Sequence, residues 1–196
     1  MNRGFTVVEL LVSMAIFVTM TSVIVAKYGS FNQSTLLTNT AYDVALVVRL
    51  AQTYGLSVKS TTQTGTPNFS LPYGVDFNEG QTSLVLFADS DPTNAPNGLY
   101  GVSDAVINTY QIIRGAKILS LCVGIDADNC HDLDNSVSKL DVSFLRPNPE
   151  AKICGTFVGG QVDCTTYSYA EVVISSTDDS TRTIVIRQNG QISVQR

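Results

Sequence analysis

The stretch of sequence that decides the fold of this 196-residue chain is GFTVVELLVSMAIFVTMTSVIVA, which covers residues 4–26. From Phe5 to Ala26 it contains no Lys, Arg, Asp, Asn or Gln, and Glu9 is its only ionisable residue. As a helix this stretch is about 30 Å long, close to the hydrocarbon thickness of a bilayer. Arg3 precedes it, and the positive-inside rule keeps that side in the cytoplasm. The stretch therefore predicts one membrane-spanning helix, with the rest of the chain outside the cytoplasm.

Three other interpretations of this segment compete with a functional membrane helix. A secretory signal peptide has a shorter apolar region, about 7–15 residues, and a small-residue cleavage site, which this run lacks. A buried core helix would require a partner for the Glu9 carboxylate. An ordinary single-pass anchor leaves Glu9 unexplained, because a carboxylate in a membrane helix is costly and usually functional. Glu9 is thus the residue that any assignment of the segment has to explain.

The N-terminal string Arg3-Gly4-Phe5-Thr6-Val7-Val8-Glu9-Leu10-Leu11-Val12 resembles the prepilin peptidase recognition motif of type IV pilins and type II secretion pseudopilins. The resemblance implies cleavage after Gly4 and N-methylation of Phe5. It also implies that Glu9 pairs with the Phe5 amine of a neighbouring subunit, which offsets part of the desolvation of both charges and sets the axial register. The expected partners are prepilin peptidase, other pilins or pseudopilins, the inner-membrane assembly machinery and, before assembly, membrane lipid.

A second helical pattern follows a short polar stretch. Apolar residues recur at spacings of three and four between residues 41 and 54, which predicts one buried stripe, and Gly55 is the expected end of the helix. The stripe contains Ala41, Val44, Ala45, Val48 and Ala51. Together the two patterns predict a single long rod with a bend near Gly29, whose second half packs on a globular domain. The expected divisions are a leader at 1–4, a membrane or fibre-core helix at 5–27, its amphipathic continuation at 28–58 and a β-rich head at 59–196.

The region after residue 59 alternates turn residues with short strand-like runs. Asn189-Gly190 between two alternating runs is a strong hairpin signal. The fold class is therefore α+β, a long N-terminal helix packed on a mainly antiparallel β domain. The expected strands are Tyr73–Phe77, Ser83–Ala88, Ala105–Ile113, Lys117–Val123, Leu140–Leu145, Ala170–Ser175, Thr181–Arg187 and Gln191–Arg196.

The layout is similar to the pseudopilin H and FimT group of minor pilins and pseudopilins. Two features are responsible for this resemblance. One is the Ala- and Val-rich helix segment that contains Arg49. The other is the closing pattern of residues 182–186, the turn at Asn189-Gly190 and residues 191–194.

Four cysteines lie within one region of the head, Cys122, Cys130, Cys154 and Cys164. An even, clustered set in an exported chain predicts disulfides. Three pairings are possible, and we favour the sequential one, Cys122 with Cys130 and Cys154 with Cys164, because it closes two short loops. Zinc is disfavoured because the spacing contains no Cys-x-x-Cys element, although His131 lies nearby.

Acidic and amide oxygens in residues 89–94 offer a candidate calcium site, with Asp89, Asp91 and Asn94 as ligands. The segment departs from the EF-hand pattern, because Pro92 interrupts it and the glycine and distal glutamate are missing. Solvated turns are the competing interpretation, since Asp and Asn are frequent in turns. We otherwise expect no cofactor.

The composition argues against a general nucleic-acid binder and against an enzyme. The net charge is -5, from 12 basic and 17 acidic residues, although Arg182, Arg187 and Arg196 are candidate DNA contacts near the C-terminus. We find one histidine, no nucleophile elbow and no phosphate-binding loop. The prediction is a structural subunit, a minor pilin or pseudopilin in the inner membrane and then in a fibre. The alternatives are a minor tip pilin that binds DNA, a surface or an exported protein, and a membrane-anchored β domain that never assembles.

Overall fold

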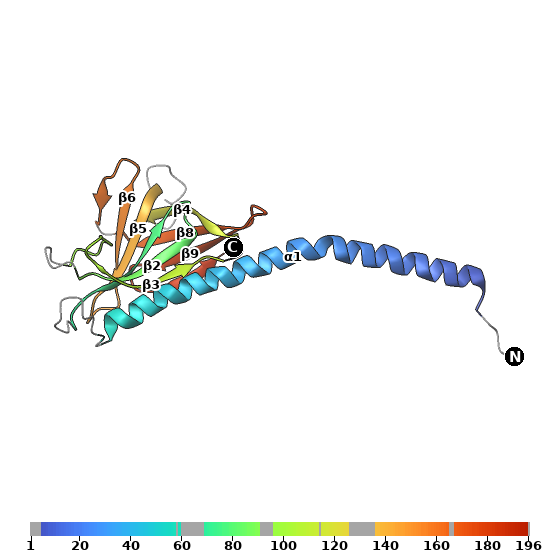
Figure 1. Ribbon diagram of the computed structural model, residues 1–196, viewed down its shortest axis with the longest axis horizontal. Coiled ribbons are helices and arrows are strands. Elements are labelled where there is room, and N and C mark those ends of the chain that lie inside the picture. Colours follow the sequence, from blue (N-terminus) through green and yellow to red (C-terminus); the bar gives the residue numbers. More distant parts are fainter. Residues whose placement is uncertain are drawn as a thin grey trace.

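The computed structural model describes residues 5–57, 59, 69–90, 96–113, 115–125, 136–164 and 167–195. A single long helix, α1, runs out of a β-rich head, and its N-terminal half extends far from every strand (Figure 1). The α+β fold class predicted from the sequence is confirmed.

Helix α1 (Val7–Leu56) is one continuous element of 50 residues, about 75 Å long at 1.5 Å per residue, and it is gently bowed in Figure 1. It begins at Thr6, whose Oγ1 accepts a hydrogen bond from the Glu9 N–H at 3.2 Å. It ends at Ser57, whose N–H donates to the Thr53 carbonyl at 2.9 Å. The helix thus continues through Gly55, which we had expected to end it. Gly55 instead serves close packing, because a Cβ there would lie 2.4 Å from the Phe144 carbonyl oxygen.

The described part of the head forms one strongly curled sheet of ten strands, in which every pairing is antiparallel. The strand order is β10-β9-β8-β4-β5-β1-β2-β3, and β6 and β7 branch from β5 as a separate hairpin. The strands are β1 (Tyr73–Asn78), β2 (Ser83–Ala88), β3 (Ala105–Gln111), β4 (Lys117–Gly124), β5 (Ser136–Phe144), β6 (Ala151–Phe157), β7 (Val162–Asp163), β8 (Tyr169–Ser175), β9 (Thr181–Arg187) and β10 (Ile192–Gln195).

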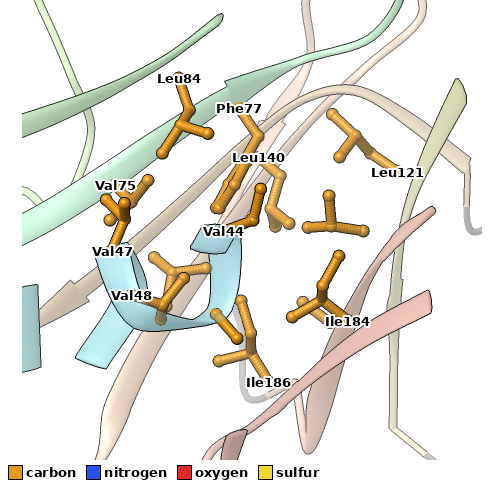
Figure 2. Close-up of a cluster of buried hydrophobic side chains, with 14 of the residues drawn as sticks. Val44, Val47, Val48, Val75, Phe77, Leu84, Leu121, Leu140, Ile184 and Ile186 are labelled. Carbon is orange, nitrogen blue, oxygen red and sulfur yellow. The ribbon is translucent and has the colours of Figure 1, made fainter. Parts of the chain in front are cut away.

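The core lies between the second half of α1 and the concave face of the sheet. All five residues of the predicted helical stripe are buried, and Val48 is fully enclosed. Alternate strand residues meet them, such as Val75 and Phe77 of β1 and Leu140 of β5 (Figure 2). Successive residues of a strand face opposite sides of a sheet, so Asp76 and Asp141 point to the outer face, away from α1.

Polar contacts join α1 to the C-terminal strands as well. Arg182 of β9 donates from Nε to Thr38 Oγ1 at 3.0 Å and from Nη2 to Ser34 Oγ at 2.9 Å. Arg49 donates to the Ile192 carbonyl at 3.1 Å. The second half of α1 is therefore an integral part of the head and not a detachable linker.

Candidate functional site

The N-terminal part of α1, with Phe5 just before it, carries more than half of the large exposed apolar side chains among the described residues. The segment Val7–Ala26 has a mean hydropathy of 2.2, and none of it is buried. Phe5, which precedes it, is 79 % exposed. Isolated soluble proteins rarely expose contiguous apolar surface on this scale, so lipid or other protein chains must cover it. Its length and composition suffice to cross a membrane, and they are consistent with a single-pass inner-membrane prepilin.

Several hydroxyl groups inside this apolar segment are satisfied within the helix itself. Ser13 Oγ donates to the Leu10 carbonyl at 2.9 Å, and Thr19 Oγ1 donates to the Ile16 carbonyl at 2.9 Å. Because these polar groups already have partners, they add little cost when the helix enters lipid or a dry fibre core.

Glu9 lies in the first turn of α1, at the third helical position, and its side chain is exposed. Its backbone N–H is occupied by Thr6, which fixes the start of the helix two residues after Gly4. A carboxylate in the first turn interacts favourably with the positive end of the helix dipole. Glu9 is thus held at the very end of an apolar rod, with its carboxylate available to a cation from another molecule.

The comparison with known proteins identifies the same segment. Residues 1–25 match the family model described as the prokaryotic N-terminal methylation motif. No curated protein and no solved structure matches the chain. The chain is therefore type IV pilin-like, with the methylation motif and the N-terminal helix of that superfamily, whose members are generally structural proteins. The motif implies processing by prepilin peptidase and assembly with other pilins. Gly4, the residue before the expected cut, lies outside the described residues.

The cysteines are engaged in disulfides wherever the structure describes them. Cys154 of β6 is bonded to Cys164, just after β7, as the sequential pairing predicts. This bond closes the β6–β7 hairpin. Cys122 is also disulfide-bonded, but Cys130 and His131 lie outside the described residues, so the Cys122–Cys130 pair stays a prediction.

Asp89, the first residue of the candidate calcium set, is buried at the end of β2 and its Oδ2 accepts the Gly98 N–H at 2.6 Å. Burial raises the pKa of Asp89, and the nearby Asp104 raises it further, against the opposing effect of the Gly98 N–H. Within the described residues no cluster of three or more metal-ligating side chains is present. Asp91 and Asn94 lie outside those residues, so calcium binding by this set stays untested.

The candidate DNA contacts do not gather into one surface in the described part of the head. Arg182 is committed to Ser34 and Thr38 of α1. Arg187 is half-buried at the end of β9, and Arg196 lies outside the described residues. Phosphate binding needs a concentrated positive surface, and the hydrogen bonds of Arg182 to α1 compete with contacts to phosphate.

A charged cluster on the outer face of the sheet was missed by the sequence interpretation. Asp76 of β1 lies directly opposite Asp141 of β5, and Lys139 places its Nζ 3.4 Å from Asp76 Oδ1 and 3.1 Å from Asp141 Oδ2. Asn78 donates to Asp76 Oδ2 at 2.8 Å. The available signal was a polar residue at every second position of both strands, namely Asp76 and Asn78 of β1 and Lys139 and Asp141 of β5.

Burial controls the protonation of this cluster. It raises the pKa of Asp141 to about 7; Lys139 opposes the shift and the facing Asp76 carboxylate adds to it. The pKa of Asp76 is raised by burial as well, against the effect of Lys139. Burial lowers the pKa of Lys139, but the two carboxylates outweigh it and the net shift is upward. One ammonium therefore faces two carboxylates, and one proton can be shared near neutral pH.

Proposed function

We propose that this protein is a structural subunit, a minor pilin or pseudopilin, of a type IV pilus or a type II secretion pseudopilus. In this proposal prepilin peptidase cleaves after Gly4 and methylates Phe5, and α1 then leaves the membrane to pack among the helices of other subunits. The single observation that supports it most is the coincidence of the methylation motif, residues 1–25, with a helical segment that is apolar and wholly exposed.

The fold supports assembly through α1 in a second way. The second half of the same helix buries its apolar stripe around Val48 in the core of the head, and it is hydrogen-bonded to β9 and β10. A force or a packing contact applied to the apolar half is therefore transmitted directly to the core of the head. Such a rigid connection suits a fibre whose helices pack centrally and whose heads face outward.

Within this class we place the chain in the pseudopilin H and FimT group. The two sequence features on which that resemblance rests lie together in the fold. Arg49 of α1 donates to the Ile192 carbonyl of the closing β9–β10 hairpin.

The register role of Glu9 is tested by the substitution Glu9→Val. We expect the variant to insert in the membrane and to be processed, but to be largely absent from the sheared-fibre fraction, because the Phe5 amine loses its partner in a dry core. Ser13→Val is the matched control: it removes a polar group from the same exposed segment, and that group is already satisfied by Leu10. Normal fibre incorporation of Glu9→Val would disprove the register role.

Processing itself is tested by mass spectrometry of the native N-terminus. A chain that begins with N-methylated Phe5 supports the proposal. A chain that retains Met1 excludes processing, and the protein would then be a membrane-anchored β domain that does not assemble.

A further inference from the structure

Residues 96–104 form a strap that crosses the outer face of the sheet, on the side away from α1. Four charged side chains attach its backbone to the sheet. Asp141 Oδ1 accepts the Tyr100 N–H at 3.1 Å, and Lys139 Nζ donates to the Tyr100 carbonyl at 2.8 Å. Asp89 Oδ2 accepts the Gly98 N–H at 2.6 Å, and Lys152 Nζ donates to the Asn97 carbonyl at 2.6 Å.

The carboxylates beneath the strap are enclosed, whereas Lys139 and Lys152 keep contact with solvent. Asp141 is 0 % exposed and Asp76 is 2 % exposed, while the Tyr100 ring packs on Phe87 with centroids 5.3 Å apart. The Lys139 ammonium, which faces both carboxylates, also lies 5.6 Å from the centre of the Tyr100 ring. If the strap lifted, water would reach both carboxylates, so closing it requires the cluster to lose most of its solvation.

We propose that the 96–104 strap is a proton-controlled latch, which closes over Asp76 and Asp141 when the pair takes up a proton and loosens when the proton leaves. Like charges directly opposite each other on neighbouring strands repel, and Lys139 can neutralise only one of them. A proton on the pair removes that repulsion while Asp141 Oδ1 can still accept the Tyr100 N–H. The second attachment responds in the same direction, because burial and the nearby Asp104 raise the pKa of Asp89 against the opposing effects of the Gly98 and Asn97 N–H groups and of Lys152.

The direction of the pH effect follows from linkage. Burial raises the pKa of Asp141 to about 7 in the closed form, whereas a solvated aspartate in the open form has a pKa near the ordinary value. The closed form therefore binds the proton more tightly, so lower pH favours closing and higher pH favours opening. The closing equilibrium is expected to weaken about tenfold from pH 6 to pH 8.

The latch would also shape a cleft in the described part of the head. That cleft has a volume of about 560 Å³, and the strap contributes Pro96 and Gly98 to its wall. Ser143 of β5 and Lys152 of β6 also line it. Opening the strap therefore widens a surface recess on the side of the head that α1 leaves free.

Hydrogen exchange of backbone amides on the purified full-length chain tests the latch. After correction for the intrinsic pH dependence of exchange, the protection of the Tyr100 amide should fall about tenfold from pH 6 to pH 8. The Arg187 amide, which donates to the Gln191 carbonyl in the β9–β10 hairpin, reports opening elsewhere and should stay constant. Asp141→Asn keeps an oxygen for the Tyr100 N–H but cannot titrate, so the fall should disappear. Asp178→Asn, in an exposed turn, should leave it unchanged.

Three results would overturn the proposal. One is protection of Tyr100 that does not change with pH, and another is a parallel change at Arg187, which would indicate global opening. The third is an unchanged fall in Asp141→Asn. Should that variant fail to fold, the carboxyl titration of Asp141 in the unmodified chain decides the matter, and an apparent pKa of 4 or below contradicts the latch.

Discussion

Replacing Gly55 by alanine tests whether tertiary packing overrides helix propensity at the end of α1. In an ordinary helix Gly→Ala stabilises by about 1 kcal/mol, because glycine loses more backbone entropy on folding. Here a Cβ at position 55 would lie 2.4 Å from the Phe144 carbonyl oxygen and 2.9 Å from Phe144 Cβ, both fixed by β5. The Gly55 carbonyl also accepts the Arg146 N–H at 3.2 Å, so the two elements cannot separate without losing a hydrogen bond.

Overpacking of this kind costs about 1–3 kcal/mol, more than the propensity gain, and we expect Gly55→Ala to destabilise the head by about 1–2 kcal/mol. For a chain of this size that lowers the midpoint of thermal unfolding by about 2–8 °C. The measurement is circular dichroism of the full-length chain in detergent. Thr53→Ala is the matched control: Thr53 lies in the same turn of the helix but is exposed, and its hydroxyl donates to the Arg49 carbonyl at 2.8 Å. A rise in the midpoint for both variants would refute the packing explanation.

Two further substitutions probe the hairpins of the head. Gly190→Ala should destabilise the head by more than about 2 kcal/mol, because Gly190 has a φ of +85° and a Cβ there would lie 2.5 Å from the Pro149 carbonyl oxygen. Urea unfolding measures this loss, and an unchanged midpoint of urea unfolding would contradict the prediction. Replacing Cys154 and Cys164 together by serine should cost about 3 kcal/mol under non-reducing conditions, the loop-closure value for a bridge of this span. Equal stability of this double variant would mean that strand pairing alone holds the β6–β7 hairpin.

The long helix and most strands followed from the sequence because a single physical signal dominates each of them. An uninterrupted apolar run and a stripe of spacing three and four predict α1, and β2 and β9 were predicted with the bounds that the structure gives. The β6–β7 hairpin was missed because its signal is weak. Strand β6 contains Lys152 and Gly155, and β7 has only two residues, so neither shows a clear alternation.

The charged cluster shows a different limit of sequence interpretation. Asp76, Lys139 and Asp141 occupy the positions that an amphipathic strand normally presents to water, and nothing local marks them as buried. They are enclosed because the strap, which carries Tyr100, folds back over the outer face from a distant part of the chain. Burial here is decided by tertiary structure and not by the local sequence of either strand.

Helix α1 packs on the head with its C-terminal half and exposes an apolar surface with its N-terminal half, and different parts of its sequence meet these two requirements. From Leu37 onward one face is apolar and fills the concave side of the sheet, while the opposite face is exposed. Before Ala26 the helix is apolar on all sides and touches no strand, so it can exchange one apolar environment for another at little cost. Because both requirements are met by one unbroken helix, a subunit drawn from lipid into a fibre need not refold its head. The structural element that is long and apolar enough to cross a membrane is thus also the one that would position the head on an assembled fibre.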